Sequence, residues 1–250
     1  MTSVSKAALL DELRRRIRRI EGIGGADGSR ILPFGIPALD QALPDGGLPL
    51  SCLHELASGE EDRFGGAATG FAAALLARIA ARHGPTVWIT RGRDLYAPGL
   101  TAFGLTPERL IVVRAERDPD VLWAMEEVLG CPRIGTVLGE AGSLDLTASR
   151  RLQLAAEAGG VTGFLLRIGR NRTPAGAAVT RWLLTSASSV PAANELGVGR
   201  TRWHARLQRC RGGTPGEWLL EWHDNGFDAV EMVMPFASGW PTPAVLERRA

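Results

Sequence analysis

LPFGIPALDQALPDGGLPLSCLHELASG, residues Leu32–Gly59, is the stretch that decides the fold of this 250-residue chain. Its end, Cys52–Leu56 (CLHEL), is a short apolar run that predicts a buried strand. A loop at Ala57–Gly66 and a helical pattern at Ala67–Arg82 follow it. Alternation of buried strands with helices is typical of a mostly parallel sheet that is covered by helices. The stretch therefore predicts an α/β domain.

The same alternation continues along the chain. Four further strands are expected at Thr86–Thr90, Leu110–Val113, Ile134–Gly139 and Val161–Ile168. Helices are expected between them at Asp94–Phe103, at Asp118–Leu129 with Asp118 as the cap, and at Thr147–Ala158. Strands without long intervening helices follow at Thr180–Ser186, Thr201–Arg209 and Glu217–Trp222. The sequence thus predicts a mostly parallel sheet flanked by helices, extended by C-terminal antiparallel strands.

Three regions are predicted from composition. Residues 1–29 hold a basic amphipathic helix at Ala7–Glu21 and a glycine-rich linker at Gly22–Ser29, residues 30–234 form the core domain, and residues 235–250 form a proline-rich irregular tail. Either the helix docks on a partner, or its charged face is solvated while the helix packs on its own domain. Its candidate contact residues are Arg14, Arg15, Arg18 and Arg19.

Composition excludes several classes of protein. The net charge of +2 and the pI of about 8.7 are too mild to argue by themselves for nucleic-acid binding. Three widely spaced cysteines favour a reducing compartment, and no apolar stretch is long enough for a membrane span. The four histidines have no metal-ligand spacing, so we expect no metal site. A soluble cytoplasmic protein is the expectation.

The stretch at Leu32–Gly59 resembles the segment around the first core strand of RecA-like recombinases. The shared features are Gly35, Leu39 and Asp40 in a short helix, the GGLP turn at Gly46–Pro49, and Glu55 in the strand. The chain is also similar to the ImuA family of bacterial damage-inducible mutagenesis proteins, in the segments LPFGIPALD, CLHEL and the later TASRRLQLAAEA. That family is RecA-like and is related to the cell-division inhibitor SulA. The resemblance implies a RecA-like core of the phosphate-loop type.

The resemblance also implies a function and partners. It implies an accessory role in error-prone translesion synthesis after DNA damage, together with ImuB and a specialised C-family polymerase. RecA itself is a further candidate partner, and direct contact with DNA is left open. Two alternatives remain: a RecA-like ATPase with an unconventional loop, and a SulA-like inhibitor of the division protein FtsZ.

The loop that would hold phosphate departs from the family pattern. Such loops need a lysine after the last glycine, and the single lysine of this chain is Lys6. At the matching place stand Gly59, Arg63, Gly65, Gly66 and Thr69, with three acids at Glu60–Asp62. Those acids repel a polyanion. We therefore expect no ATP or magnesium cofactor and no enzymatic activity, although Arg63 and Thr69 are the residues that the ATPase alternative would use.

Two acids lie where the RecA-like fold implies catalytic carboxylates. Asp94 follows the second strand and Glu140 follows the fourth. Structural roles are the favoured interpretation of both. Asp94 is expected to cap the next helix, and Glu140 is expected to lie in a loop and pair with Arg133 or Arg167.

A basic strand is the last candidate site. Within Gly199–Arg211 (GRTRWHARLQRCR), alternation places Arg202, His204 and Arg206 on one face and Trp203 on the other. The basic face is a candidate contact for DNA or for an acidic protein, and solvated surface is the alternative. The loop at Gly169–Ala178 is a second candidate, with Arg170 and Arg172 available for phosphates.

Overall fold

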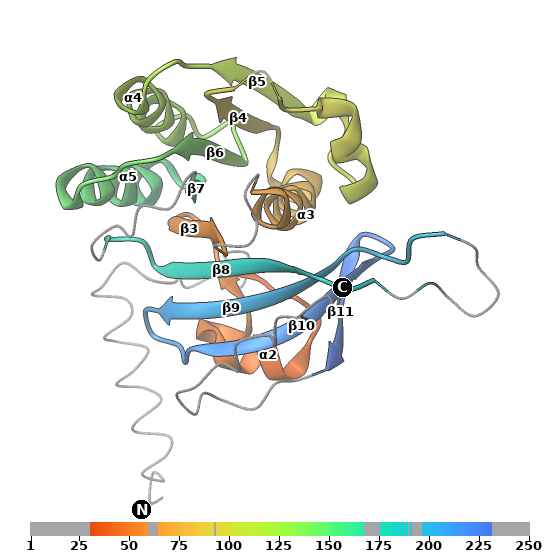
Figure 1. Ribbon diagram of the computed structural model, residues 1–250. Helices are drawn as coiled ribbons and strands as arrows, with labels where there is room; N and C mark the ends of the chain where they lie inside the picture. Colours follow the sequence, from red (N-terminus) through yellow and green to blue (C-terminus); the bar gives the residue numbers. More distant parts are fainter. Residues whose placement is uncertain are drawn as a thin grey trace, which may run out of the picture.

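A nine-stranded sheet is the centre of the computed structural model, which describes residues 31–59, 65–92, 94–167, 176–189, 191 and 197–231 (Figure 1). In chain order the elements are β1 (Ile31–Leu32), α2 (Pro37–Ala42), η2 (Pro44–Gly46), β2 (Leu48–Pro49), β3 (Leu53–Ser58), α3 (Gly66–His83), β4 (Thr86–Thr90), η3 (Ala97–Phe103), η4 (Pro107–Arg109), β5 (Leu110–Arg114), α4 (Asp118–Leu129), β6 (Thr136–Ala141), α5 (Leu146–Gly159), β7 (Thr162–Arg167), β8 (Thr180–Ala187), β9 (Arg202–Cys210), β10 (Gly216–His223) and β11 (Gly226–Glu231).

The strand order is β11-β10-β9-β8-β3-β7-β6-β4-β5. All pairings from β8 through β5 are parallel, whereas β8 to β11 are joined by antiparallel pairings. The predicted fold class is therefore confirmed. Parallel strands end on the same side, so the ends of β3, β4, β6 and β7 share one border of the sheet, which we call the carboxyl edge.

Helices cover both faces of the parallel strands. α3 packs on one face, and it is rich in alanine and almost wholly buried, because small side chains let the helix approach the sheet closely. α4 and α5 pack on the other face through Val121, Met125 and Leu152. The antiparallel strands continue the α3 side of the core with Trp182, Trp203 and other aromatic rings around Phe71.

A buried histidine ties β3 to β8 near the start of both strands. The ring of His54 is wholly buried and stacks on Phe164. Its Nε2 lies 2.8 Å from the Pro49 carbonyl, which can only accept, so Nε2 carries the proton. Nδ1 then accepts from the Thr180 hydroxyl at 2.7 Å, and that hydroxyl oxygen accepts from Trp182 Nε1 at 3.0 Å. Burial lowers the pKa of His54 to about 4, which keeps the ring neutral.

The predicted set of elements needs two corrections. Asp94–Phe103 is not an α-helix: the helix there is a 3₁₀ helix over Ala97–Phe103, which has proline in its first turn and ends at Gly104 in the left-handed region. The strand β11 was missed altogether. It forms a hairpin with β10 through Asp224 and Asn225, which both have positive φ.

Two of the predicted regions, residues 1–29 and 235–250, lie outside the described residues, and with them the basic helix and the tail. Within the described ranges, no helix has the length and apolar content that crossing a bilayer requires.

Candidate site at the carboxyl edge

The segment that would bind phosphate begins and ends at described glycines. The Gly59 N–H donates to the Leu184 carbonyl of β8 at 2.9 Å, which fixes the exit from β3. Gly65 precedes α3 in the left-handed region, with φ of 69°, and its carbonyl accepts from Thr69 N–H. Gly66 opens the helix, and Thr69 is half-buried. Arg63 and the three acids lie outside the described residues.

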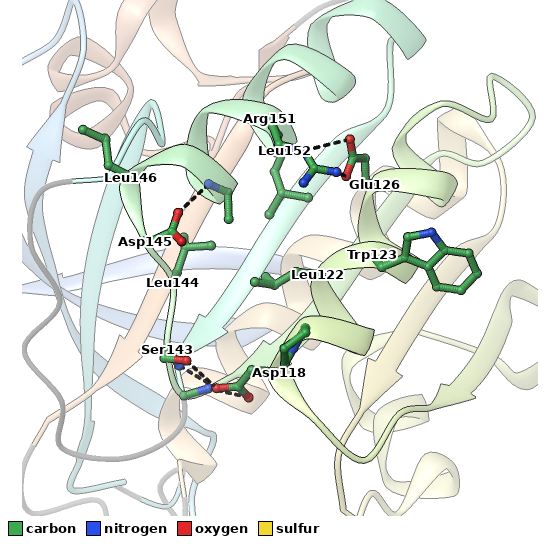
Figure 2. A pocket seen from close by; sticks show the side chains of 13 residues that line it. Asp118, Leu122, Trp123, Glu126, Ser143, Leu144, Asp145, Leu146, Arg151 and Leu152 are labelled. Carbon is green, nitrogen blue, oxygen red and sulfur yellow. Dashed lines mark hydrogen bonds and ion pairs between the residues drawn. The ribbon is translucent and has the colours of Figure 1, made fainter.

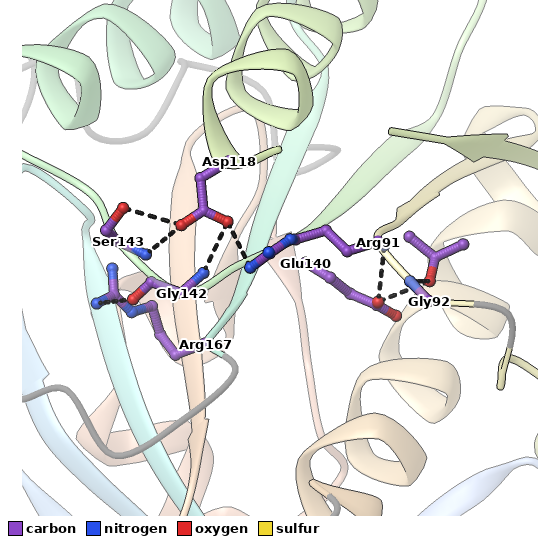
Figure 3. A network of polar contacts seen from close by, with 8 residues as sticks. Arg91, Gly92, Asp118, Glu140, Gly142, Ser143 and Arg167 are labelled. Carbon is purple, nitrogen blue, oxygen red and sulfur yellow. Dashed lines mark hydrogen bonds and ion pairs between the residues drawn. The ribbon is translucent and has the colours of Figure 1, made fainter. Parts of the chain in front are cut away.

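The carboxylate of Glu140 accepts hydrogen bonds from other residues of the chain (Figure 3). Glu140 belongs to β6 rather than to a loop, and only 8% of its surface is exposed. Trp88 Nε1 donates to Oε1 at 2.7 Å, and the Thr90 hydroxyl donates to Oε2 at 2.7 Å. The expected pairing with Arg133 or Arg167 is wrong. Because both oxygens accept from side chains of β4, the carboxylate fastens β4 to β6.

Asp118 joins the ends of β4 and β6 to the start of α4. It accepts from the backbone of Gly142 at 3.2 Å and of Ser143 at 2.8 Å, and it forms an ion pair with Arg91 at 2.9 Å (Figure 3). Partial burial alone would raise the pKa of Asp118, but the hydrogen bonds from Ser143 and Gly142 and the Arg91 charge bring it below its ordinary value. The expected capping role is wrong, because the cap position is Arg117.

Arg167 ends β7 beside this network. Its Nη2 donates to the Gly142 carbonyl at 3.0 Å, whereas Nη1 is buried and has no hydrogen-bond partner among the described residues. Burial, with a further contribution from the Arg181 charge, lowers the pKa of Arg167. Arg181 is itself paired with the buried Glu55 at 2.8 Å. At the carboxyl edge, Glu55, Asp118 and Glu140 are thus each in contact with an internal donor.

Asp94 takes no part in that network. Its side chain is exposed, and it lies three residues before η3, so the expected capping role is wrong for this residue too. The described ranges contain no group of three or more His, Cys, Asp or Glu that could hold a metal ion.

The basic strand is now β9, and its predicted alternation is confirmed. Trp203 is buried, whereas Arg202, His204 and Arg206 are half-exposed on the other face. The neighbouring strand β10 brings two acids to that face, which the sequence reading missed. Glu221 pairs with Arg202 at 2.6 Å, and Glu217 pairs with Arg206. The face is therefore a cross-strand ladder of ion pairs rather than a purely basic surface.

Six further candidate residues come from the predicted basic helix and from the loop at Gly169–Ala178. Those that lie outside the described residues are all six: Arg14, Arg15, Arg18, Arg19, Arg170 and Arg172. Their roles stay predictions.

A groove between the first halves of α4 and α5 is a further surface feature (Figure 2). Leu122, Leu144 and Leu152 line it, and Arg151 pairs across it with Glu126. At its border, Trp123 is 63% exposed. The groove combines this apolar surface with charged side chains that are engaged within the protein: Asp118 accepts from Ser143, Glu126 pairs with Arg151, and Asp145 caps α5.

Comparison with known proteins identifies the family. No family model matches the chain. Protein ImuA from two strains of Caulobacter vibrioides, NA1000/CB15N and ATCC 19089/CIP 103742/CB 15, is 39% identical over 207 residues, which are 78% of this chain and 85% of each relative. The solved structure of SulA from Pseudomonas aeruginosa aligns with a TM-score of 0.41 at 23% identity, covering 47% of this chain and 98% of SulA. With that identity over that coverage, the chain belongs to the ImuA family.

Proposed function

We propose that this chain is a non-enzymatic accessory protein of DNA-damage-induced mutagenesis, which acts in the cytoplasm as an adaptor for error-prone translesion synthesis. Membership of the ImuA family supports the accessory role. The hydrogen bonds that occupy Glu140 at the carboxyl edge support the absence of catalysis. The adaptor would act through contacts between proteins and would not cycle between nucleotide states.

The engagement of Glu140 is the observation that carries the proposal. ATP hydrolysis on a phosphate-loop fold requires a lysine at the phosphates and a carboxylate that is available to support magnesium. Both oxygens of Glu140 accept from Trp88 and Thr90, and the single lysine of the chain is Lys6, far from the loop in sequence. The described residues at this edge therefore do not fit magnesium-bound ATP.

The proposed partners come from the family. They are ImuB and a specialised C-family polymerase, with RecA as a further candidate. Direct DNA binding through β9 has weaker support, because Glu217 and Glu221 lie beside its arginines and would repel a phosphate backbone. Contact with an acidic surface would meet the same obstacle. Protein contacts elsewhere on the chain are the favoured mode of action.

The proposal is tested with purified protein in three assays. Mg-ATP is expected to leave the melting temperature unchanged, and phosphate release is expected to stay at the level of a blank, with an active RecA-like ATPase as the positive control. A purified ImuB protein from the same bacterium is expected to bind. Turnover together with stabilisation by Mg-ATP would establish an enzyme, and altered FtsZ polymerisation without ImuB binding would establish the SulA-like alternative.

A further inference from the structure

The strand β5 has one unpaired side. It is the last strand in the sheet order, and its only strand partner among the described residues is β4. Ala115 N–H donates to the Thr90 carbonyl, so in this parallel ladder the odd-numbered residues of β5 bond to β4. The backbone N–H and C=O groups of Val112 and Arg114 therefore point away from the sheet. The Leu110 carbonyl does so too, while its N–H is bonded to Pro107.

Two exposed side chains of this strand are apolar, one on each face of the sheet, and the strand ends at the exposed Arg114. Ile111 is 48% exposed on the α4 face, and Val112 is 41% exposed on the α3 face. The register with β4 is continuous from Leu110 to Arg114, with no bulge. No proline or charged residue interrupts Leu110–Val113. Proteins ordinarily protect an open sheet edge with prolines, charged side chains or bulges, and over Leu110–Val113 none of these is present, so this part of the edge is competent to pair.

We propose that the outer edge of β5 receives an extended segment of a partner protein, which adds to the sheet as a further strand. This inference rests on the proposed function, because it assigns a place to the contact with ImuB. A row of unpaired backbone donors and acceptors is satisfied by another strand, whereas a helix has already used its own backbone groups. The segment is four or five residues long, apolar on both faces, and free of proline at its centre.

A second copy of this chain is the less suitable occupant. Pairing two five-residue strands edge to edge buries little surface, and stable interfaces bury about 1,200 Å² or more. A partner that inserts a flexible segment needs only the strand contact plus the contacts that its own fold makes nearby. The same variants separate the two occupants. If a second copy were the occupant, the purified protein would form a dimer in the absence of ImuB.

The test removes a single backbone donor. Proline at position 112 deletes an N–H that makes no hydrogen bond within the described fold, so Val112→Pro keeps the ladder with β4. Val112→Ala is the matched control, because it shortens the side chain and keeps the donor. Val112→Lys is a second blocking variant in case the proline variant fails to fold. Each protein is titrated with purified ImuB, and backbone amide exchange is followed in the free and bound states.

The expected result has two parts. Val112→Pro and Val112→Lys weaken ImuB binding about tenfold or more, whereas Val112→Ala weakens it about threefold or less. In the complex the amides of Val112 and Arg114 become protected, while that of Val113 is protected already in the free protein. Full binding by both blocking variants, or no new protection at Val112, overturns the inference and leaves the proposed function standing. Failure of the unaltered protein to bind ImuB overturns both, and a dimer that Val112→Pro dissociates makes a second copy the occupant.

Discussion

Lowering the pH from 7 to 5 is expected to destabilise the protein through His54. The folded protein holds this ring neutral, with Nδ1 accepting from Thr180 and Nε2 donating to Pro49. Protonation would place a second donor against a hydroxyl that already accepts from Trp182. Burial opposes the charge as well, and the pKa falls from the ordinary value of 6.5 to about 4.

Proton linkage gives the direction and the size of the change in the free energy of unfolding. Between pH 6.5 and about 4 the unfolded chain binds the proton and the folded chain does not, so stability falls as the pH falls. Above pH 6.5 the contribution of His54 to stability is fully present. With these two pKa values, the free energy of unfolding decreases by about 2 kcal/mol between pH 7 and pH 5.

Urea unfolding followed by tryptophan fluorescence measures this loss. The comparison is with His54→Gln, whose amide can still donate to Pro49 and accept from Thr180 but does not titrate. The variant is expected to be less stable at pH 7, and its loss between pH 7 and pH 5 is expected to be about 2 kcal/mol smaller than in the unaltered protein. An equal loss in both proteins would refute the assignment to His54. Asp118 and Glu221, whose pKa values are lowered, contribute equally to both proteins.

Three further changes test the packing and the carboxyl edge. Asp145→Ala removes the 2.7 Å hydrogen bond that caps α5 at Ala148 N–H, and it should lower the free energy of unfolding by about 1 kcal/mol in urea titrations. Gly159→Ala places a Cβ 1.9 Å from the Leu129 carbonyl, so a loss of about 1–3 kcal/mol is expected, and an unchanged melting temperature would contradict the close approach. Glu140→Gln replaces one accepting oxygen by an amide N–H, which would face the donor of Trp88 or of Thr90. The free energy of unfolding should fall by about 1–3 kcal/mol, and Mg-ATP should still have no effect on the melting temperature.

Local pattern was enough to predict most of the sheet. The strand Thr86–Thr90 and the helix Asp118–Leu129 have the bounds that their apolar periodicity indicated. The two errors arose where turn chemistry prevails over periodicity. Proline at position 98 would lie in the interior of the expected helix, where it is disfavoured, and the observed helix begins only at Ala97, with the proline in its first turn. The hairpin before β11 depends on a two-residue turn, for which Asn225 followed by glycine was an available signal.

The carboxyl edge was less accessible to sequence reading, because its contacts join residues far apart in the chain. Glu140 accepts from Trp88, 52 positions earlier, and Asp118 accepts from Ser143, 25 positions later. A single sequence shows the residue types but not these pairs. Local rules assigned Asp118 to a cap, since an acid before a helix usually has that role. The register of β4 against β6 brings Trp88 to Glu140, and the packing of α4 beside the end of β6 brings Asp118 to Ser143.

The missing lysine and the state of Glu140 are independent observations, which strengthens the case against catalysis. With 28 arginines and one lysine among 29 basic residues, compositional bias alone can remove lysine from a loop. Bias of that kind does not place an indole N–H and a hydroxyl on the two oxygens of Glu140. Restoring a lysine after Gly65 would therefore leave the carboxylate occupied, and magnesium could reach it only after β4 and β6 lose their link. On this reasoning the lysine variant alone gains no turnover, whereas turnover after that single change would show that Glu140 is free to leave its partners.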